Sequence, residues 1–171
     1  MSASTLISLT ENLSTSYRPD CDYVDGEVRE RNVGESEHSI LQAAITAWFW
    51  NHQREWEIDV RPEQRVQVSP TRFRVPDVCV LRQRESREPI VSWPPLICIE
   101  ILSKDDTLRS MRERVNDYVD FGTENVWILD PATREAFVCS RTGFLSLGSG
   151  EMKVSGTPVF LPLSEIFRAL N

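Results

Sequence analysis

The stretch LICIEIL, residues 96–102, is apolar at every position except Glu100. A strand that is apolar on both faces belongs in the middle of a sheet covered on both sides. Residues 107–121 follow with apolar side chains at helical spacing, and residues 125–129 form a second apolar strand. This strand–helix–strand order predicts two parallel strands joined by a right-handed crossover.

A second helix is expected before this unit. Residues 36–52 place Leu41 and Ile45 at helical spacing, and His38 starts on the same side as this apolar stripe. Ser36 is the expected N-cap because its hydroxyl can accept a backbone hydrogen bond in the first turn.

Shorter elements complete the pattern. Residues 64–68 and 73–81 predict a hairpin around the turn at residues 69–71. Short strands are expected at residues 136–139 and near Val159, and a terminal helix after them. The fold class that follows is α/β: a single domain with a mixed sheet and flanking helices.

Composition limits the kind of protein. The 171 residues suit one domain, which we expect to span residues 20–171 after an N-terminal extension over residues 1–19. A net charge of −7 argues against a protein that coats nucleic acid through bulk charge. No stretch reaches the ~18 apolar residues of a membrane span, and no signal peptide is evident. The four cysteines form no CxxC pair, so we expect reduced thiols and a cytoplasmic location.

Two carboxylates interrupt apolar strand sequences. Glu100 shares a strand face with Cys98 and Leu102, and Asp77 shares one with Val75. A buried carboxylate takes up a proton or attracts a cation. Two of them on neighbouring strands, with phosphate oxygens and water, form the oxygen site that Mg²⁺ prefers. A structural ion pair with arginine explains either carboxylate alone equally well.

These carboxylates lie within an ordered set of motifs that resembles the Uma2 (DUF820) family. The set consists of YVDGE (residues 23–27), GESEH (34–38), Pro76-Asp77, EILS (100–103), Tyr118, Gly122 and WILDP (127–131). The resemblance implies a restriction-endonuclease-like core of the PD-(D/E)xK nuclease superfamily. It also implies a site for Mg²⁺ or Mn²⁺ with Asp77 and Glu100 as ligands, DNA as substrate and a homodimer.

The resemblance suggests Glu27 and His38 as further site residues. The alternatives are an exposed turn residue for Glu27 and a core or capping histidine for His38.

The sequence departs from the superfamily pattern at its lysine. Leu102 stands two residues after Glu100, where the superfamily name asks for Lys. The related pattern K-x-x-x-Y places Arg114 at the lysine position, four residues before Tyr118. Arginine stays charged and is a poor general base, although it can neutralise a phosphate or hold Glu100. Lys104 is the alternative cation, unless it is simply a solvated side chain.

Two functions are consistent with these residues. The first is a metal-dependent endonuclease that hydrolyses DNA phosphodiester bonds. The second is a catalytically impaired nuclease fold that serves as a nucleic-acid-binding or assembly module. The second function predicts an ion pair between Arg114 and Glu100 that fills the metal pocket.

Overall fold

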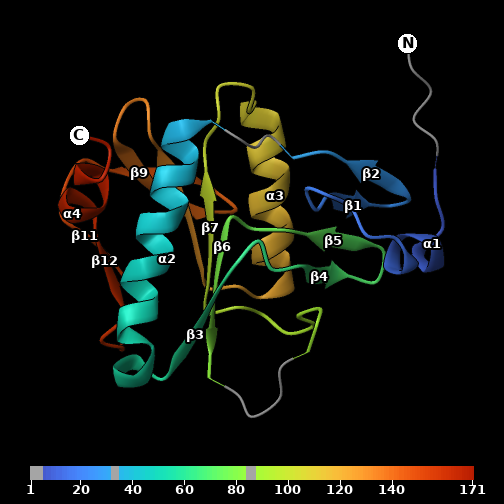
Figure 1. Cartoon of the computed structure of the whole chain (residues 1–171), viewed down its shortest axis with the longest axis horizontal. Helices are drawn as coiled ribbons and strands as arrows, with labels where there is room; N and C mark the ends of the chain where they lie inside the picture. The colour runs from blue at the N-terminus through green and yellow to red at the C-terminus, as the bar shows by residue number, and fades with distance from the viewer. Residues whose placement is uncertain (1–5, 32–34, 84–87) are drawn as a thin grey trace.

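The central feature of the fold is a six-stranded mixed sheet with helices on both sides (Figure 1). The computed structural model describes residues 6–31, 35–83 and 88–171. The strand order in this sheet is β10-β9-β8-β7-β6-β3. Its strands are β3 (Ile58–Pro62), β6 (Val78–Arg82), β7 (Ile97–Ile101), β8 (Asn125–Asp130), β9 (Glu135–Ser140) and β10 (Gly143–Leu147).

Two smaller sheets and four helices accompany it among the described residues. One small sheet has the order β2-β1-β5-β4, and the other pairs β11 with β12. The strands are β1 (Asp22–Val24), β2 (Glu27–Arg29), β4 (Val66–Ser69), β5 (Arg72–Arg74), β11 (Glu151–Lys153) and β12 (Phe160–Pro162). The helices are α1 (Leu9–Ser14), α2 (Ser36–Trp56), α3 (Leu108–Phe121) and α4 (Leu163–Arg168).

The predicted strand–helix–strand unit with parallel strands is confirmed. Strand β7 runs parallel to β8, and α3 connects them. A capping box between Thr107 and Ser110 begins α3, and Gly122, in the left-handed region at φ 106°, ends it. The mixed α/β class with flanking helices therefore holds.

The two faces of β7 have different surroundings. Ile97, Ile99 and Ile101 are buried in a cluster with side chains from α2. Cys98 is buried on the other face with side chains from α3, including Tyr118. Helices α2 and α3 accordingly lie on opposite sides of β7 in Figure 1. A strand that is covered on both faces explains the nearly continuous apolar sequence.

The predicted strand over residues 73–81 is wrong as a single element. The chain forms β5, leaves the small sheet at Val75-Pro76-Asp77, and re-enters the large sheet as β6. The hairpin of β4 and β5 is confirmed by their antiparallel pairing. Pro76 has no backbone N–H to donate, so a break between ladders is the place where it costs least. This break puts Asp77 directly before β6.

Helix α2 also differs from its prediction. Its N-cap residue is Glu35 rather than Ser36, and no side chain makes a cap hydrogen bond there. The helix continues past residue 52 to Trp56, which packs into the apolar cluster, and Glu57 at φ 52° ends it. The sequence prediction missed β3, which follows directly and pairs with β6. Within the described ranges, none of the helices has the length and apolar character to cross a membrane.

Candidate active site

Asp77 and Glu100 are brought together by neighbouring strands of the large sheet. Strands β6 and β7 are antiparallel, with Val78 opposite Ile99. The start of β6 therefore lies beside the end of β7, and the backbone N–H of Ile101 donates to Asp77 Oδ2 at 2.7 Å. Both carboxylates are almost fully buried, at 2% and 1% exposure. The predicted convergence of these two acids thus has a direct structural cause.

Asp77 is held by two basic side chains. Arg31 Nη2 lies 2.5 Å from Asp77 Oδ1, and His38 Nε2 lies 3.3 Å from Oδ2. Burial disfavours the charged form of His38, but the hydrogen bond and the charge of Asp77 outweigh it and raise the pKa of His38. The histidine at the start of α2 is therefore part of the carboxylate cluster and not a capping residue.

Glu100 has fewer charged partners. Tyr118 donates its hydroxyl to Glu100 Oε1 at 2.6 Å, and Arg114 Nη1 lies 3.3 Å from Oε2. Burial raises the pKa of Glu100 to about 7, although the charge of Arg114 opposes the shift. The ion pair that the non-catalytic function predicts is present, but it leaves Glu100 short of positive charge.

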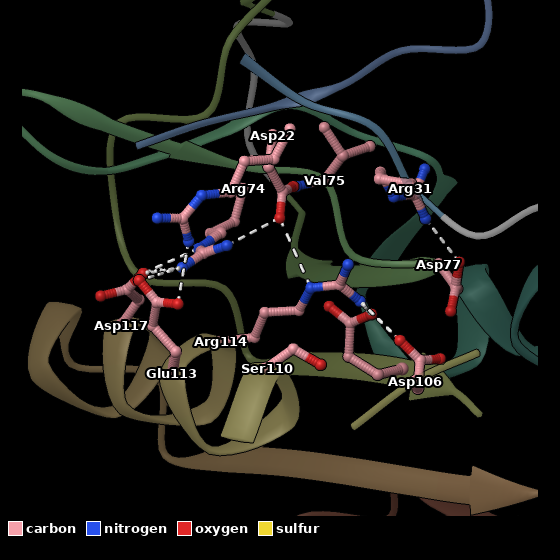
Figure 2. A network of polar contacts seen from close by, with 12 residues as sticks. Asp22, Arg31, Arg74, Val75, Asp77, Asp106, Ser110, Glu113, Arg114 and Asp117 are labelled. Carbon is pink, nitrogen blue, oxygen red and sulfur yellow. Dashed lines mark hydrogen bonds and ion pairs between the residues drawn. The ribbon is translucent and has the colours of Figure 1, made fainter. Parts of the chain in front are cut away.

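A third acid, Asp22, completes the cluster from the small sheet. Asp22 Oδ2 lies 2.8 Å from Arg74 Nη1 and 3.4 Å from Arg114 Nε, and Oδ1 accepts from the Val75 N–H at 3.0 Å. Arg74 also forms an ion pair with Asp117 on α3, with 2.7 Å between Nη2 and Oδ2. Figure 2 shows Arg114 lying between Asp22 and Asp106, with Arg31 beside Asp77. Strand β1 is thereby tied to α3 through arginine.

Sequence reasoning missed Asp22, Arg31 and Arg74 as members of this cluster. Asp22 carries a weak signal, because a carboxylate in a strand next to buried Tyr23 has to find a partner. Arg31 carries none, since an arginine in a connection resembles any solvated arginine in sequence.

Two predicted site residues lie outside the carboxylate cluster. Lys104 Nζ pairs with Glu35 at 3.1 Å, and its side chain is 75% exposed. Glu27 on β2 is half-buried and pairs with Arg29 at 2.7 Å, and Arg29 in turn contacts Glu113 on α3. Of the predicted site residues besides the two carboxylates, His38 and Arg114 thus belong to the carboxylate cluster. Gly34, from the motif GESEH, lies outside the described residues.

Asp77 and Glu100 have the donor atoms of a divalent cation site. Carboxylate oxygens are the donor type that Mg²⁺ prefers, and a Mg²⁺ site needs only one or two of them when phosphate and water supply the rest. No group of three or more His, Cys, Asp or Glu suited to a metal occurs in the described part of the chain. The residues therefore fit a two-carboxylate site, and the burial that raises the pKa of Glu100 favours a cation beside its carboxylate. A metal ion would compete there with Arg114.

The chain is similar to known proteins in sequence pattern and in fold. The family model described as "Uma2: Putative restriction endonuclease" matches residues 11–169. A crystal structure from Anabaena variabilis, described as a putative nuclease belonging to DUF820, is similar to the chain with a TM-score of 0.81. The two share 20% identity over 96% of this chain and 99% of that chain, which establishes the likeness of fold. No curated protein matches the sequence.

Proposed function

Because this chain belongs to the Uma2 family of restriction-endonuclease-like proteins, we propose that it hydrolyses DNA phosphodiester bonds with Mg²⁺ or Mn²⁺. The observation that carries the proposal is the meeting of Asp77 and Glu100 at one end of β6 and β7, linked through the Ile101 N–H. Two acids at the ends of adjacent strands can share one cation, as the sequence pattern predicts.

Each residue around the carboxylates has a separate role in this proposal. The metal ion, when bound, would supply an activated water and neutralise charge on the phosphate. Tyr118 orients Glu100 through its 2.6 Å hydrogen bond, and His38 orients Asp77. Arg114 stays protonated, so it can offset negative charge at Glu100 or at a phosphate but cannot accept a proton.

The test is cleavage of supercoiled plasmid DNA in the presence of Mg²⁺ or Mn²⁺. We expect nicking by the natural protein and loss of nicking in Asp77→Asn and Glu100→Gln, which keep the side-chain shapes. Glu165→Gln on α4 is the matched control, since Glu165 is exposed. Circular dichroism establishes that each variant is folded. Folded protein that cleaves no form of DNA with either metal would contradict the proposal.

A second function is favoured by a specific observation. Arg31 and Arg114 already lie against Asp77 and Glu100, as in a catalytically impaired module in which arginine replaces the metal. Such a protein would bind nucleic acid or assemble with other chains without cutting DNA. Mn²⁺ titration followed by electron paramagnetic resonance separates the two functions, because only the nuclease needs a bound ion. The homodimer that the resemblance implies stays a prediction, and light scattering tests it.

A further inference from the structure

Arg31 has an unused donor in the middle of the carboxylate cluster. It follows β2, and only 2% of its side chain is exposed. Nη2 is bound to Asp77, but the buried Nη1 has no hydrogen-bond partner in the described part of the chain. A buried donor of a charged group without an acceptor costs free energy. Such a donor is therefore a site where an oxygen-bearing ligand would be bound favourably.

The other arginines of the cluster have a carboxylate at close range. Arg74 Nη2 also makes no hydrogen bond within the described residues, but it lies 2.7 Å from Asp117 Oδ2, while Nη1 lies 2.8 Å from Asp22. Arg114 lies between Asp22 and Glu100. Both thus serve to join the small sheet, α3 and β7. Arg31 alone among these three contacts Asp77, and Figure 2 shows it apart from the group around Arg74.

Arg31 carries a positive charge, because arginine stays protonated in proteins. A guanidinium group presents a planar set of donors that matches the oxygens of carboxylates and phosphates. One edge of this group can therefore remain on Asp77 while the other receives a second anionic oxygen.

We propose that Arg31 binds the phosphate of the DNA backbone at the candidate active site, with Nη2 on Asp77 and Nη1 donating to a non-bridging phosphate oxygen. This inference rests on the proposed function, since it names the residue that would hold the substrate. Arg31 lies outside every motif of the family resemblance. Its contribution is binding and orientation of the phosphodiester beside Asp77.

The experiment measures binding of a fluorescent DNA duplex at low ionic strength with EDTA present. We expect the affinity to fall about tenfold in Arg31→Met, as for loss of a charge-assisted hydrogen bond. The slope of log affinity against log salt should decrease by about one. Arg31→Lys keeps the positive charge and should retain part of the affinity. Near-ultraviolet circular dichroism establishes that each variant keeps its tertiary structure.

The matched control is Arg74→Lys, which alters an arginine of equal burial that contacts Asp22 instead of Asp77. Affinity that falls equally in Arg74→Lys and Arg31→Lys would overturn the inference, because a general structural effect would explain both. Natural protein that binds no duplex under these conditions would overturn it as well. So would a folded Arg31→Met variant with unchanged affinity and salt slope.

The outcomes also separate this inference from the proposed function. Binding that depends on Arg31, without cleavage by Mn²⁺-loaded protein, supports the phosphate site and contradicts the nuclease. Cleavage with an unchanged KM in Arg31→Lys and Arg31→Met supports the nuclease and overturns the phosphate site.

Discussion

The two faces of β7 differ in what they contribute to the molecule. On the α2 side, Ile97, Ile99 and Ile101 lie in an entirely apolar cluster. On the α3 side, Cys98 is followed by Glu100, whose carboxylate contacts Tyr118 and Arg114. Apolar burial stabilises the fold wherever it occurs, but a buried carboxylate costs desolvation energy that only its partners offset. One strand therefore combines a stabilising face with a face suited to chemistry.

The largest effect on stability is expected from the apolar face. Ile99→Ala should lower the free energy of unfolding by about 2–5 kcal/mol, because it removes buried methyl groups and leaves a cavity against α2. Ile99 is fully buried. Urea denaturation measures the change. Leu108→Ala is the control, since Leu108 is 61% exposed and its truncation should have little effect. A loss below about 1 kcal/mol at Ile99 would contradict a close-packed face.

On the α3 side of β7, Glu100 should make the free energy of unfolding depend on pH. The pKa of Glu100 is raised from 4.5 to about 7 in the folded protein. Between these values the folded state holds a proton that the unfolded state has released, so the free energy of unfolding decreases as pH rises. The expected decrease is about 3 kcal/mol from this group. Urea denaturation across this pH range measures it.

Glu100→Gln isolates the contribution of Glu100. The pKa of His38 is also raised by Asp77, so protonation of His38 favours the folded state in the same direction. The variant should therefore keep only the pH dependence that His38 contributes, which makes it more stable than the natural protein above pH 7. An identical pH dependence in both proteins would contradict a raised pKa of Glu100. Added Mn²⁺ should reduce the dependence of the natural protein if Glu100 binds the metal ion.

Part of the fold and of the candidate site is predictable from the sequence. The β7–α3–β8 unit is predictable, because hydrophobic spacing, the stop at Gly122 and the turn after Leu129 are local properties. Glu100 and Asp77 stand out since each interrupts an apolar strand. Their partners are not predictable in this way. Most of the basic residues are arginines, and only the folded chain selects Arg31, Arg74 and Arg114.

The missed elements have related physical causes. Strand β3 follows α2 with a single residue, Glu57, between them, so no turn sequence separates the two. Pro76 interrupts the strand-forming residues 73–81, but the transfer of the chain between two sheets depends on how the hairpin of β4 and β5 packs. Long-range packing also decides that Asp22 on β1 meets Arg74 on β5.

A smaller effect is expected from the arginine at the lysine position. Arg114→Lys should increase plasmid nicking about tenfold, because lysine can release a proton in a buried site and arginine cannot. Arg112→Lys on the exposed side of α3 is the control. Unchanged nicking would mean that the cation at this position only positions Glu100. Nicking that falls would mean that the guanidinium fork, which spans Asp22 and Glu100, is itself required.

The smallest effect is expected at Lys104, the other basic candidate in the sequence. Its side chain is exposed and pairs with Glu35, and hydrogen bonding to Glu35 raises the pKa of Lys104. Exposed ion pairs contribute little to stability, so Lys104→Ala should leave the denaturation midpoint unchanged and alter nicking by less than about twofold. Glu35→Gln serves as the partner control. A loss of nicking as large as that of Glu100→Gln would mean that Lys104 leaves Glu35 and reaches the DNA. The positive charge that nicking requires would then come from Lys104, after β7, and not from Arg114 on α3.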